Sequence, residues 1–279
     1  MNPASFTFPT KDGLSLLGRA WISPSSQPKG IVHLVHGLGE HSGRYDHIGK
    51  ALAEAGYHMA SFDLRGHGLS EGRRGHTPGL SYLMEDIQLF IVESSKHLGN
   101  SLPKFFYGHS LGGNLVISFG LQNHSDFIGA IVTSPVIRTT TPPPKVKVAL
   151  AKFMANVTPG LTFKNGLETD ALSRNKAIVK AYRDDIYVHD FITARLGLDL
   201  LESGQMALEN ANKWEKPLLL MHGAADRITS PIASKEFAEK AGDPVEFVLW
   251  KESFHELHND FVAEQVINKI IHWLDKNVN

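Results

Sequence analysis

The sequence predicts an α/β protein built on a mostly parallel, doubly wound sheet, with a helical segment inserted into it. Short and nearly continuous apolar runs recur along the 279 residues, and helical patterns separate most of them. Apolar runs without alternation are typical of strands that are buried on both faces, as in parallel sheets. Helices between such strands favour parallel pairing, because a parallel crossover needs a long return segment.

Six apolar runs are predicted as buried strands. They span residues 31–35, 57–62, 104–107, 130–132, 218–221 and 245–250. Helical patterns cover residues 45–55 and 82–98, and a last helix is expected over residues 261–276. Two further runs, 5–8 and 14–21, have no helix between them. They flank a turn at Lys11-Asp12-Gly13, so we expect an antiparallel hairpin at the edge of the sheet.

The alternation of strand and helix patterns stops between Arg138 and Gln205. This stretch shows no strand pattern, and it opens with three threonines and three prolines at 139–144, which are typical of a turn or linker. Helical patterns then follow over residues 146–157, 172–182 and 191–201. We therefore expect a helical cap over residues 138–205, inserted into a core made of residues 1–137 and 206–279.

Composition narrows the possible chemistry. The chain has no cysteine, which excludes disulfides, thiolate metal sites and a cysteine nucleophile. A formal net charge of −1 predicts no general attraction to nucleic acid or anionic lipid. The N-terminus lacks a basic stretch followed by an apolar run, and no segment approaches the roughly 18 apolar residues of a membrane span. A soluble, cytoplasmic protein is predicted, and peripheral contact with membranes stays open.

Ser110 is the predicted nucleophile. It is the centre of a G-x-S-x-G motif with Gly108 and Gly112, after a predicted strand and before a helical pattern over residues 114–121. Such a serine must sit on a sharp strand-to-helix turn, and glycine two residues away on each side lets the strand and the helix approach without clashes. The N-terminus of the helix then directs free N–H groups at the place where negative charge develops.

A serine hydroxyl needs a base, and that base needs an orienting acid. In strand-turn-helix serine hydrolases the chain order is serine, acid, histidine. Asp226 fits the acid, because it follows the predicted strand at 218–221. His255 fits the base, because it lies after the last strand and before the last helix; His258 is the rival. His222 and His109 are interpreted as structural.

Two backbone N–H groups should hold the oxyanion. Leu111, directly after the nucleophile, and Leu38, in the loop at residues 36–41, are the expected donors; a simple glycine turn is the alternative for that loop. His36 and His41 could suggest a metal pair, but no third ligand accompanies them, so no metal is predicted. Asp63 and Arg65 are tempting as catalytic residues, and we interpret them as holding the neighbouring loop in place.

Three segments carry a resemblance to a known family. Residues 36–45 (HGLGEHSGRY), 66–72 (GHGLSEG) and 108–113 (GHSLGG) resemble monoacylglycerol lipases and related lysophospholipase-like serine hydrolases of the α/β-hydrolase superfamily. The resemblance implies hydrolysis of monoacylglycerol to glycerol and a fatty acid, without a cofactor, under a helical lid. It carries over Ser110, Asp226 and His255 as the triad and the amides of Leu38 and Leu111 as oxyanion donors. It also places Glu40 near the glycerol end of the pocket. Residues 172–175 resemble the LSR segment of the family's lid.

The cap opens with an apolar stripe that has two possible roles. Its members recur at helical spacing: Val146, Ala149, Leu150, Phe153, Met154 and Val157. The stripe could pack against the core, or it could line an acyl tunnel and face a lipid surface, since Lys145, Lys147 and Lys152 flank it as in interfacial helices. On the second interpretation Leu150, Phe153 and Met154 contact the substrate.

The sequence thus predicts a serine ester hydrolase that acts on an acylglycerol or another lipid ester, with transient contact with a lipid surface through the cap. A monoacylglycerol lipase is the preferred activity, and a broader carboxylesterase or a lysophospholipase is the alternative. A receptor-like member that binds a ligand without turnover is a second class, because some receptors keep an intact triad. Dehalogenases and epoxide hydrolases are disfavoured, because they place aspartate at the position of Ser110.

Overall fold

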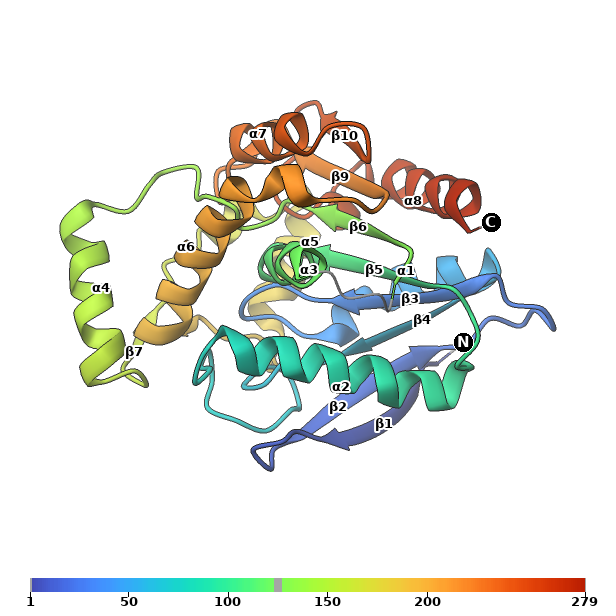
Figure 1. Cartoon of the computed structure of the whole chain (residues 1–279), viewed down its shortest axis with the longest axis horizontal. Coiled ribbons are helices and arrows are strands. Elements are labelled where there is room, and N and C mark those ends of the chain that lie inside the picture. The colour runs from blue at the N-terminus through green and yellow to red at the C-terminus, as the bar shows by residue number, and fades with distance from the viewer. Residues whose placement is uncertain (1, 123–126, 279) are drawn as a thin grey trace.

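The computed structural model describes residues 2–122 and 127–278. An eight-stranded sheet crosses the molecule in the order β1-β2-β4-β3-β5-β6-β9-β10 (Figure 1). Its strands are β1 (Ala4–Pro9), β2 (Ser15–Trp21), β3 (Gly30–Val35), β4 (Tyr57–Phe62), β5 (Lys104–His109), β6 (Gly129–Thr133), β9 (Leu218–Gly223) and β10 (Val245–Trp250). β2 pairs antiparallel with β1 and with β4, and all other pairs are parallel. The edge hairpin and the positions of the six predicted strands are confirmed, but β10 is only partly buried, because it lies at the edge of the sheet.

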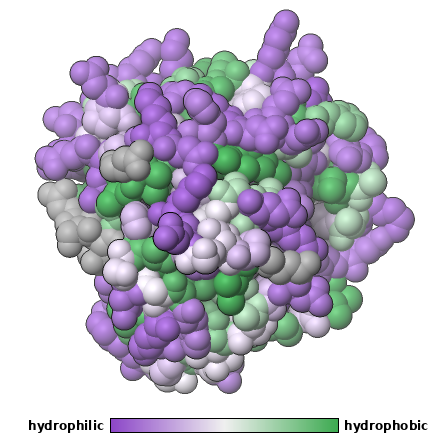
Figure 2. Space-filling view, turned by 90° about the vertical axis from the view of Figure 1, so that its right-hand side faces the viewer, coloured by the Kyte–Doolittle hydropathy of each residue, from purple (hydrophilic) through white to green (hydrophobic). Residues whose placement is uncertain are grey.

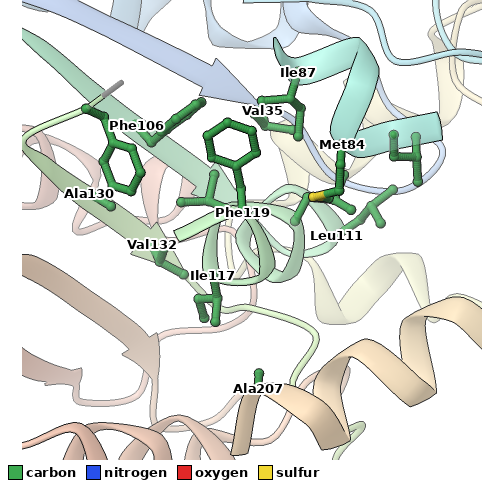
Figure 3. Close-up of a cluster of buried hydrophobic side chains, with 14 of the residues drawn as sticks. Val35, Met84, Ile87, Phe106, Leu111, Ile117, Phe119, Ala130, Val132 and Ala207 are labelled. Carbon is green, nitrogen blue, oxygen red and sulfur yellow. The ribbon is translucent and has the colours of Figure 1, made fainter. Parts of the chain in front are cut away.

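Helices cover both faces of the sheet. One face is covered by α1 (Asp46–Glu54) and α8 (Ala263–Asn277), and the other by α2 (Leu80–Leu98), α3 (Leu111–Leu121) and α7 (Pro231–Ala241). Every residue of β3 and β4 is buried, as expected of strands between two helical layers. Figure 3 shows part of the core where α2 and α3 meet the sheet, with Phe119 of α3 beside Phe106 of β5, and Leu111 of α3 on the side of Met84 of α2. This packing fixes α3, whose first residue follows Ser110.

The predicted cap segment, residues 138–205, combines helices with long connecting loops and one short pair of strands. It contains α4 (Lys145–Val157), α5 (Lys176–Asp184) and the first part of α6 (Ala194–Glu209). The prediction that it holds no strand is wrong, because β7 (Thr162–Lys164) and β8 (Phe191–Thr193) form an antiparallel pair. Strands of three residues are too short to produce a readable alternation. Short 3₁₀ helices complete the fold, at Ser42–Tyr45, Thr169–Ala171, Ala211–Lys213 and Leu257–Asn259.

Helix boundaries in this segment depend on capping side chains. α6 begins at Ala194 instead of Phe191, because the Thr193 hydroxyl accepts a hydrogen bond from the Leu196 N–H. α5 begins at Lys176 instead of Leu172, because Asn175 accepts from the Ala177 N–H in the same way. α6 also continues to Glu209, so the boundary predicted at residue 205 falls inside a helix.

The apolar stripe of α4 faces outward. Val146, Leu150, Phe153 and Val157 expose between 59% and 75% of their surface. The inner side of α4 faces α6, where Ala155 packs with Ala194 and Leu198, and Met154 packs against them (Figure 1). Burial of the whole stripe against the core is therefore wrong; the helix instead turns Ala155 and Met154 inward. At the opposite end of the molecule, hydrophilic and hydrophobic side chains are interspersed (Figure 2).

None of the helices within residues 2–122 and 127–278 is long and apolar enough to cross a bilayer.

Candidate active site

Ser110 occupies a strained turn between β5 and α3. Its backbone has φ 53° and ψ −114°, a conformation that a non-glycine residue adopts only where the surrounding structure imposes it. A Cβ atom added to Gly112 would lie 1.9 Å from the Val35 carbonyl oxygen, and one added to Gly108 would lie 2.5 Å from the Gly112 carbonyl oxygen. Gly108 and Gly112 therefore cannot be replaced by a residue with a side chain without moving the backbone. The Ser110 N–H donates to the Thr133 carbonyl at 3.0 Å, which ties the turn to β6.

His255 lies between Ser110 and Asp226. Its Nε2 is 2.9 Å from the Ser110 Oγ, and its Nδ1 is 2.7 Å from the Asp226 Oδ2. A carboxylate only accepts hydrogen bonds, so Nδ1 carries the proton and Nε2 is free to accept from the serine hydroxyl. All three residues are buried, and the structure brings them together from three separate strand ends.

The Asp226 carboxylate is surrounded by donors. Its Oδ1 accepts from the backbone N–H groups of Ile228 and Thr229, at 2.7 and 3.0 Å. Its Oδ2 accepts hydrogen bonds from the His255 Nδ1 and from the Thr229 hydroxyl, the latter at 2.9 Å. The Nε2 of His222 lies 3.1 Å from the same oxygen. Burial alone would raise the pKa of Asp226, but His255 and His222 hold it well below its usual range.

The electrostatics of His255 follow from its partner. Burial would lower the pKa of His255, but the negative charge of Asp226 and the hydrogen bond to it raise the pKa above its usual value of 6.5. The imidazolium that forms when His255 takes a proton is therefore stabilised.

His258, the rival base, lies elsewhere. It is fully buried, and its ring stacks on that of Tyr45 with 4.8 Å between the centroids. No hydrogen bond within the described residues joins its ring to Ser110, and burial lowers its pKa to about 3. A neutral, enclosed imidazole at this position fits a packing role better than that of a base.

The two predicted oxyanion donors, Leu111 and Leu38, both lie close to Ser110. As the first residue of α3, Leu111 has an N–H without a partner inside the helix, and its buried side chain anchors it in the core (Figure 3). Leu38 lies in the loop after β3, next to Gly37. A Cβ atom added to Gly37 would lie 3.3 Å from the Ser110 Cβ, so this loop passes close to the serine. Leu38 also lines the cavity at Ser110.

Glu40 holds the Leu38 loop from within. Its Oε1 accepts hydrogen bonds from the Gly37 N–H and the Tyr45 hydroxyl, both at 2.7 Å. Arg44 donates to the other oxygen of Glu40 and, through two parallel bonds of 2.8 Å, to both oxygens of Glu256. We call Glu40, Arg44 and Glu256 the charged clamp.

The charged clamp was not predicted from the sequence. Burial would raise the pKa of Glu256, but Arg44 holds it well below its usual value. Since Glu256 directly follows His255 in the chain, the clamp connects the histidine loop with the predicted oxyanion loop. The position of Glu256 beside a predicted catalytic histidine was visible in the sequence, but its partner was not.

The cap segment forms backbone hydrogen bonds with both of these loops. The His189 N–H donates to the Gly39 carbonyl at 2.8 Å, next to Leu38. The Glu256 N–H donates to the Leu172 carbonyl at 2.8 Å, within the segment that resembles the family's LSR motif. Arg174 of the same segment forms an ion pair with Asp260 at 2.7 Å.

Asp63 and Arg65 have the structural role that we inferred for them. The Asp63 Oδ1 accepts from the Ser42 N–H at 2.9 Å, and its Oδ2 accepts from the Leu69 N–H at the same distance. Arg65 pairs with the buried Asp86 at 2.6 Å. These contacts hold the loops beside the predicted oxyanion strand.

His36 and His41 also have separate partners. The His36 Nε2 accepts from the Leu64 N–H at 2.9 Å, and the His41 Nε2 lies 2.9 Å from the Asp185 carboxylate in the cap segment.

A cavity of about 490 Å³ opens over Ser110, within the usual range for small-molecule sites. Its apolar wall includes Val136, Leu167, Leu172, Ile192, Leu200, Leu201 and Ile228. Glu40, Tyr182 and Glu256 form a polar part of its lining. Leu150, Phe153 and Met154 are not among the described residues that line it, because α4 lies outside α6 and turns Leu150 and Phe153 toward solvent. The predicted contact of these three residues with the substrate has no support from this cavity.

Known proteins resemble the chain over nearly its whole length. It is 35% identical over 272 residues to an abhydrolase domain-containing protein of Dictyostelium discoideum, covering 96% of this chain but only 28% of that protein. It is 30% identical over 265 residues to a monoacylglycerol lipase of Mycolicibacterium smegmatis, covering 94% of this chain and 93% of that one. The crystal structure of a monoacylglycerol lipase from Paleococcus ferrophilus superposes with a TM-score of 0.84 at 34% identity, covering 99% and 100% of the two chains.

The family whose model matches the chain is described as serine aminopeptidase, S33, and the match extends over residues 26–261. The sheet order, the strained serine between β5 and α3, and these similarities agree with one another. The chain belongs to this family of α/β hydrolases, and it is a serine hydrolase of the monoacylglycerol lipase and esterase group.

Proposed function

We propose that the protein cleaves monoacylglycerols into glycerol and a fatty acid, with Ser110 as nucleophile, His255 as general base and Asp226 as the orienting acid. The observation that carries the proposal is the position of His255, 2.9 Å from the Ser110 Oγ and 2.7 Å from the Asp226 Oδ2. Hydrogen-bond contact between nucleophile, base and acid is the arrangement that activates a serine hydroxyl.

The reaction would proceed through an acyl-enzyme. His255 takes the hydroxyl proton as the Ser110 Oγ attacks the ester carbonyl, and the N–H groups of Leu38 and Leu111 stabilise the tetrahedral oxyanion. His255 then gives the proton to the departing glycerol oxygen, which breaks the ester bond. A water molecule attacks the acyl-enzyme by the same route, and the fatty acid leaves. Asp226 stays ionised and holds the imidazole in the productive tautomer throughout.

The lining of the cavity suits a lipid ester, because its apolar part fits an acyl chain and its polar part fits a neutral head group. Leu172, Leu200 and Leu201 offer an apolar surface, where each buried CH₂ group is worth about 0.8 kcal/mol. The charged clamp beside Ser110 carries two carboxylates and one guanidinium. This excess of negative charge disfavours an anionic phosphate head, and hydroxyl groups of glycerol can donate to it.

We also propose that the outer face of α4 contacts the lipid surface that holds the substrate. Val146, Leu150, Phe153 and Val157 are exposed there, and Lys145, Lys147 and Lys152 flank them. An apolar face bordered by lysines is typical of helices that lie in the interface of a bilayer.

Release of fatty acid from a monoacylglycerol by the purified protein tests the function. Ser110→Ala should lower kcat by about 10⁶-fold, as removal of a triad serine does in other hydrolases, with the protein still folded. Ser118→Ala is the matched control, because Ser118 is a buried serine of α3, the helix that follows Ser110, and its hydroxyl has no partner within the described residues. Ordinary turnover by Ser110→Ala would overturn the assignment.

A substrate panel tests the choice of ester. The kcat/KM should be highest on monoacylglycerol, compared with diacylglycerol, a lysophospholipid and a short nitrophenyl ester. A higher value on the lysophospholipid or on the short ester would replace the proposal with a lysophospholipase or a general carboxylesterase. Labelling of Ser110 by a fluorophosphonate without turnover of any of these esters would indicate a ligand-binding receptor instead.

A further inference from the structure

A second histidine lies on the far side of the Asp226 carboxylate. His222 is the fifth residue of β9 and has no solvent exposure. Its Nε2 lies 3.1 Å from the Asp226 Oδ2, the same oxygen that receives the Nδ1–H of His255 at 2.7 Å. The acid of the proposed triad is thus held between two imidazoles.

The neighbours of His222 determine which of its nitrogens carries a proton. Nε2 faces the Asp226 Oδ2 and, at 3.2 Å, the Thr229 carbonyl oxygen, and both of these groups only accept hydrogen bonds. Nε2 must therefore be a donor. Nδ1 lies 2.8 Å from the Ser234 Oγ on α7, and in a neutral ring it accepts the hydroxyl proton of that serine.

This arrangement makes the orientation of Asp226 depend on α7 as well as on its own loop. Within the loop of Asp226, two backbone N–H groups hold Oδ1, and the Thr229 hydroxyl donates to Oδ2 at 2.9 Å. His222 adds a fixed donor on Oδ2, and Ser234 fixes the ring of His222 in turn. Buried hydrogen bonds to a charged group are among the stronger ones in proteins.

We propose that His222 is a positioning residue for catalysis: its Nε2–H, oriented by Ser234, fixes the Asp226 carboxylate so that His255 is held in register with Ser110. The inference rests on the proposed triad, and it assigns to His222 a role that the sequence alone had suggested was only structural packing.

Two substitutions separate the hydrogen bond from the bulk of the ring. His222→Leu removes the donor, and kcat on a monoacylglycerol should fall by about 10- to 100-fold, as expected for a lost hydrogen bond to a charged group, with KM changed by less than about 2-fold. In His222→Gln the amide N–H can replace Nε2–H, and kcat should recover to within about 5-fold of the natural enzyme. A residue that serves only to fill space would give a kcat that does not distinguish leucine from glutamine.

His33→Leu is the matched control. His33 is likewise buried in a strand, β3, and its Nε2 lies 2.9 Å from a serine hydroxyl, that of Ser94, but it has no carboxylate partner within the described residues. It should lose stability as His222→Leu does while keeping kcat per active site. Active sites are counted by fluorophosphonate labelling, so that unfolded molecules do not affect the comparison.

The tautomer of His222 is tested on the natural protein, which removes any doubt about folding of a variant. In a ¹⁵N NMR spectrum at pH 8, the His222 ring, assigned by the loss of its signals in His222→Gln, should be protonated on Nε2. Protonation on Nδ1 alone would overturn the inference, and so would an unchanged kcat in a folded His222→Leu. Failure of the natural enzyme to turn over any ester would instead contradict the proposed function.

Discussion

Arg44→Met tests how strongly the charged clamp stabilises the fold. The substitution keeps much of the side chain's length but leaves Glu40 and Glu256 without the guanidinium, and their side chains are only 3% and 2% exposed. Breaking a buried ion pair in this way costs about 3–5 kcal/mol. With an unfolding entropy of about 2.1 cal/mol/K per residue, a chain of this length should lose about 5–9 °C in Tm.

The loss should depend on pH, and its sign follows from Glu256. In the natural protein the pKa of Glu256 lies below its usual value of 4.5, so the ionised group adds stability above that pH, and this is lost as the pH falls through the lowered pKa. Without Arg44, burial raises the pKa above 4.5, so the ionised group is destabilising at high pH and becomes neutral as the pH falls. The difference in Tm should therefore be largest at pH 8 and clearly smaller at pH 5.

Scanning calorimetry at pH 8, 6.5 and 5 measures this difference. Arg138→Met is the matched control, because Arg138 pairs with Glu236 at the surface, where the two side chains are 46% and 36% exposed. Exposed pairs contribute about 0–1 kcal/mol, which corresponds to less than about 2 °C here. An equal loss at all three pH values, or a loss for Arg44→Met no larger than that of the control, would refute the reasoning.

Three further predictions concern catalysis and the lipid surface. His255 must be neutral to accept the serine proton, and Asp226 raises its pKa, so kcat/KM on a neutral ester should fall as the pH drops through a value above 6.5. Half-maximal activity of the natural enzyme at a pH below 6.5 would contradict this account. Asp226→Asn should lower kcat by about 10⁴-fold. Replacing Leu150 and Phe153 by serine should weaken sedimentation with phosphatidylcholine vesicles several-fold while leaving turnover of a short soluble ester unchanged. The matched control replaces Val92 of α2 and Ile232 of α7 by serine, because both are exposed and lie outside the cap segment. Equal binding of the two double variants to the vesicles would count against the role of α4.

The sequence predicted the sheet well, and the three candidate catalytic residues that it indicated lie together in the structure, for physical reasons. Strands buried between two helical layers need uninterrupted apolar runs, and those runs end where functional loops begin, which pointed to Ser110, Asp226 and His255. The three-residue strands β7 and β8 left no readable period.

Other features depend on where chain segments meet in space, which a pattern does not contain. Arg44 and Glu256 are 212 residues apart, and nothing in either neighbourhood indicates the other. The contact of His222 with Asp226 depends on the turn between them, which brings a strand residue and a loop residue together. α4 has apolar residues on more than one side, so its stripe alone could not show which side the helix presents to α6.

The hydrogen bonds from His189 to Gly39 and from Glu256 to Leu172 join main chain to main chain. They depend on the path of the cap segment, and side-chain contacts such as Arg174 with Asp260 and Asp185 with His41 also join that segment to the core. Substitutions in the cavity lining around Leu200 and Leu201 can therefore change the shape of the cavity while these two backbone bonds keep the loops at residues 39 and 256 in place. A graft of a cap from another hydrolase should succeed only if it reproduces the backbone trace at residues 172 and 189.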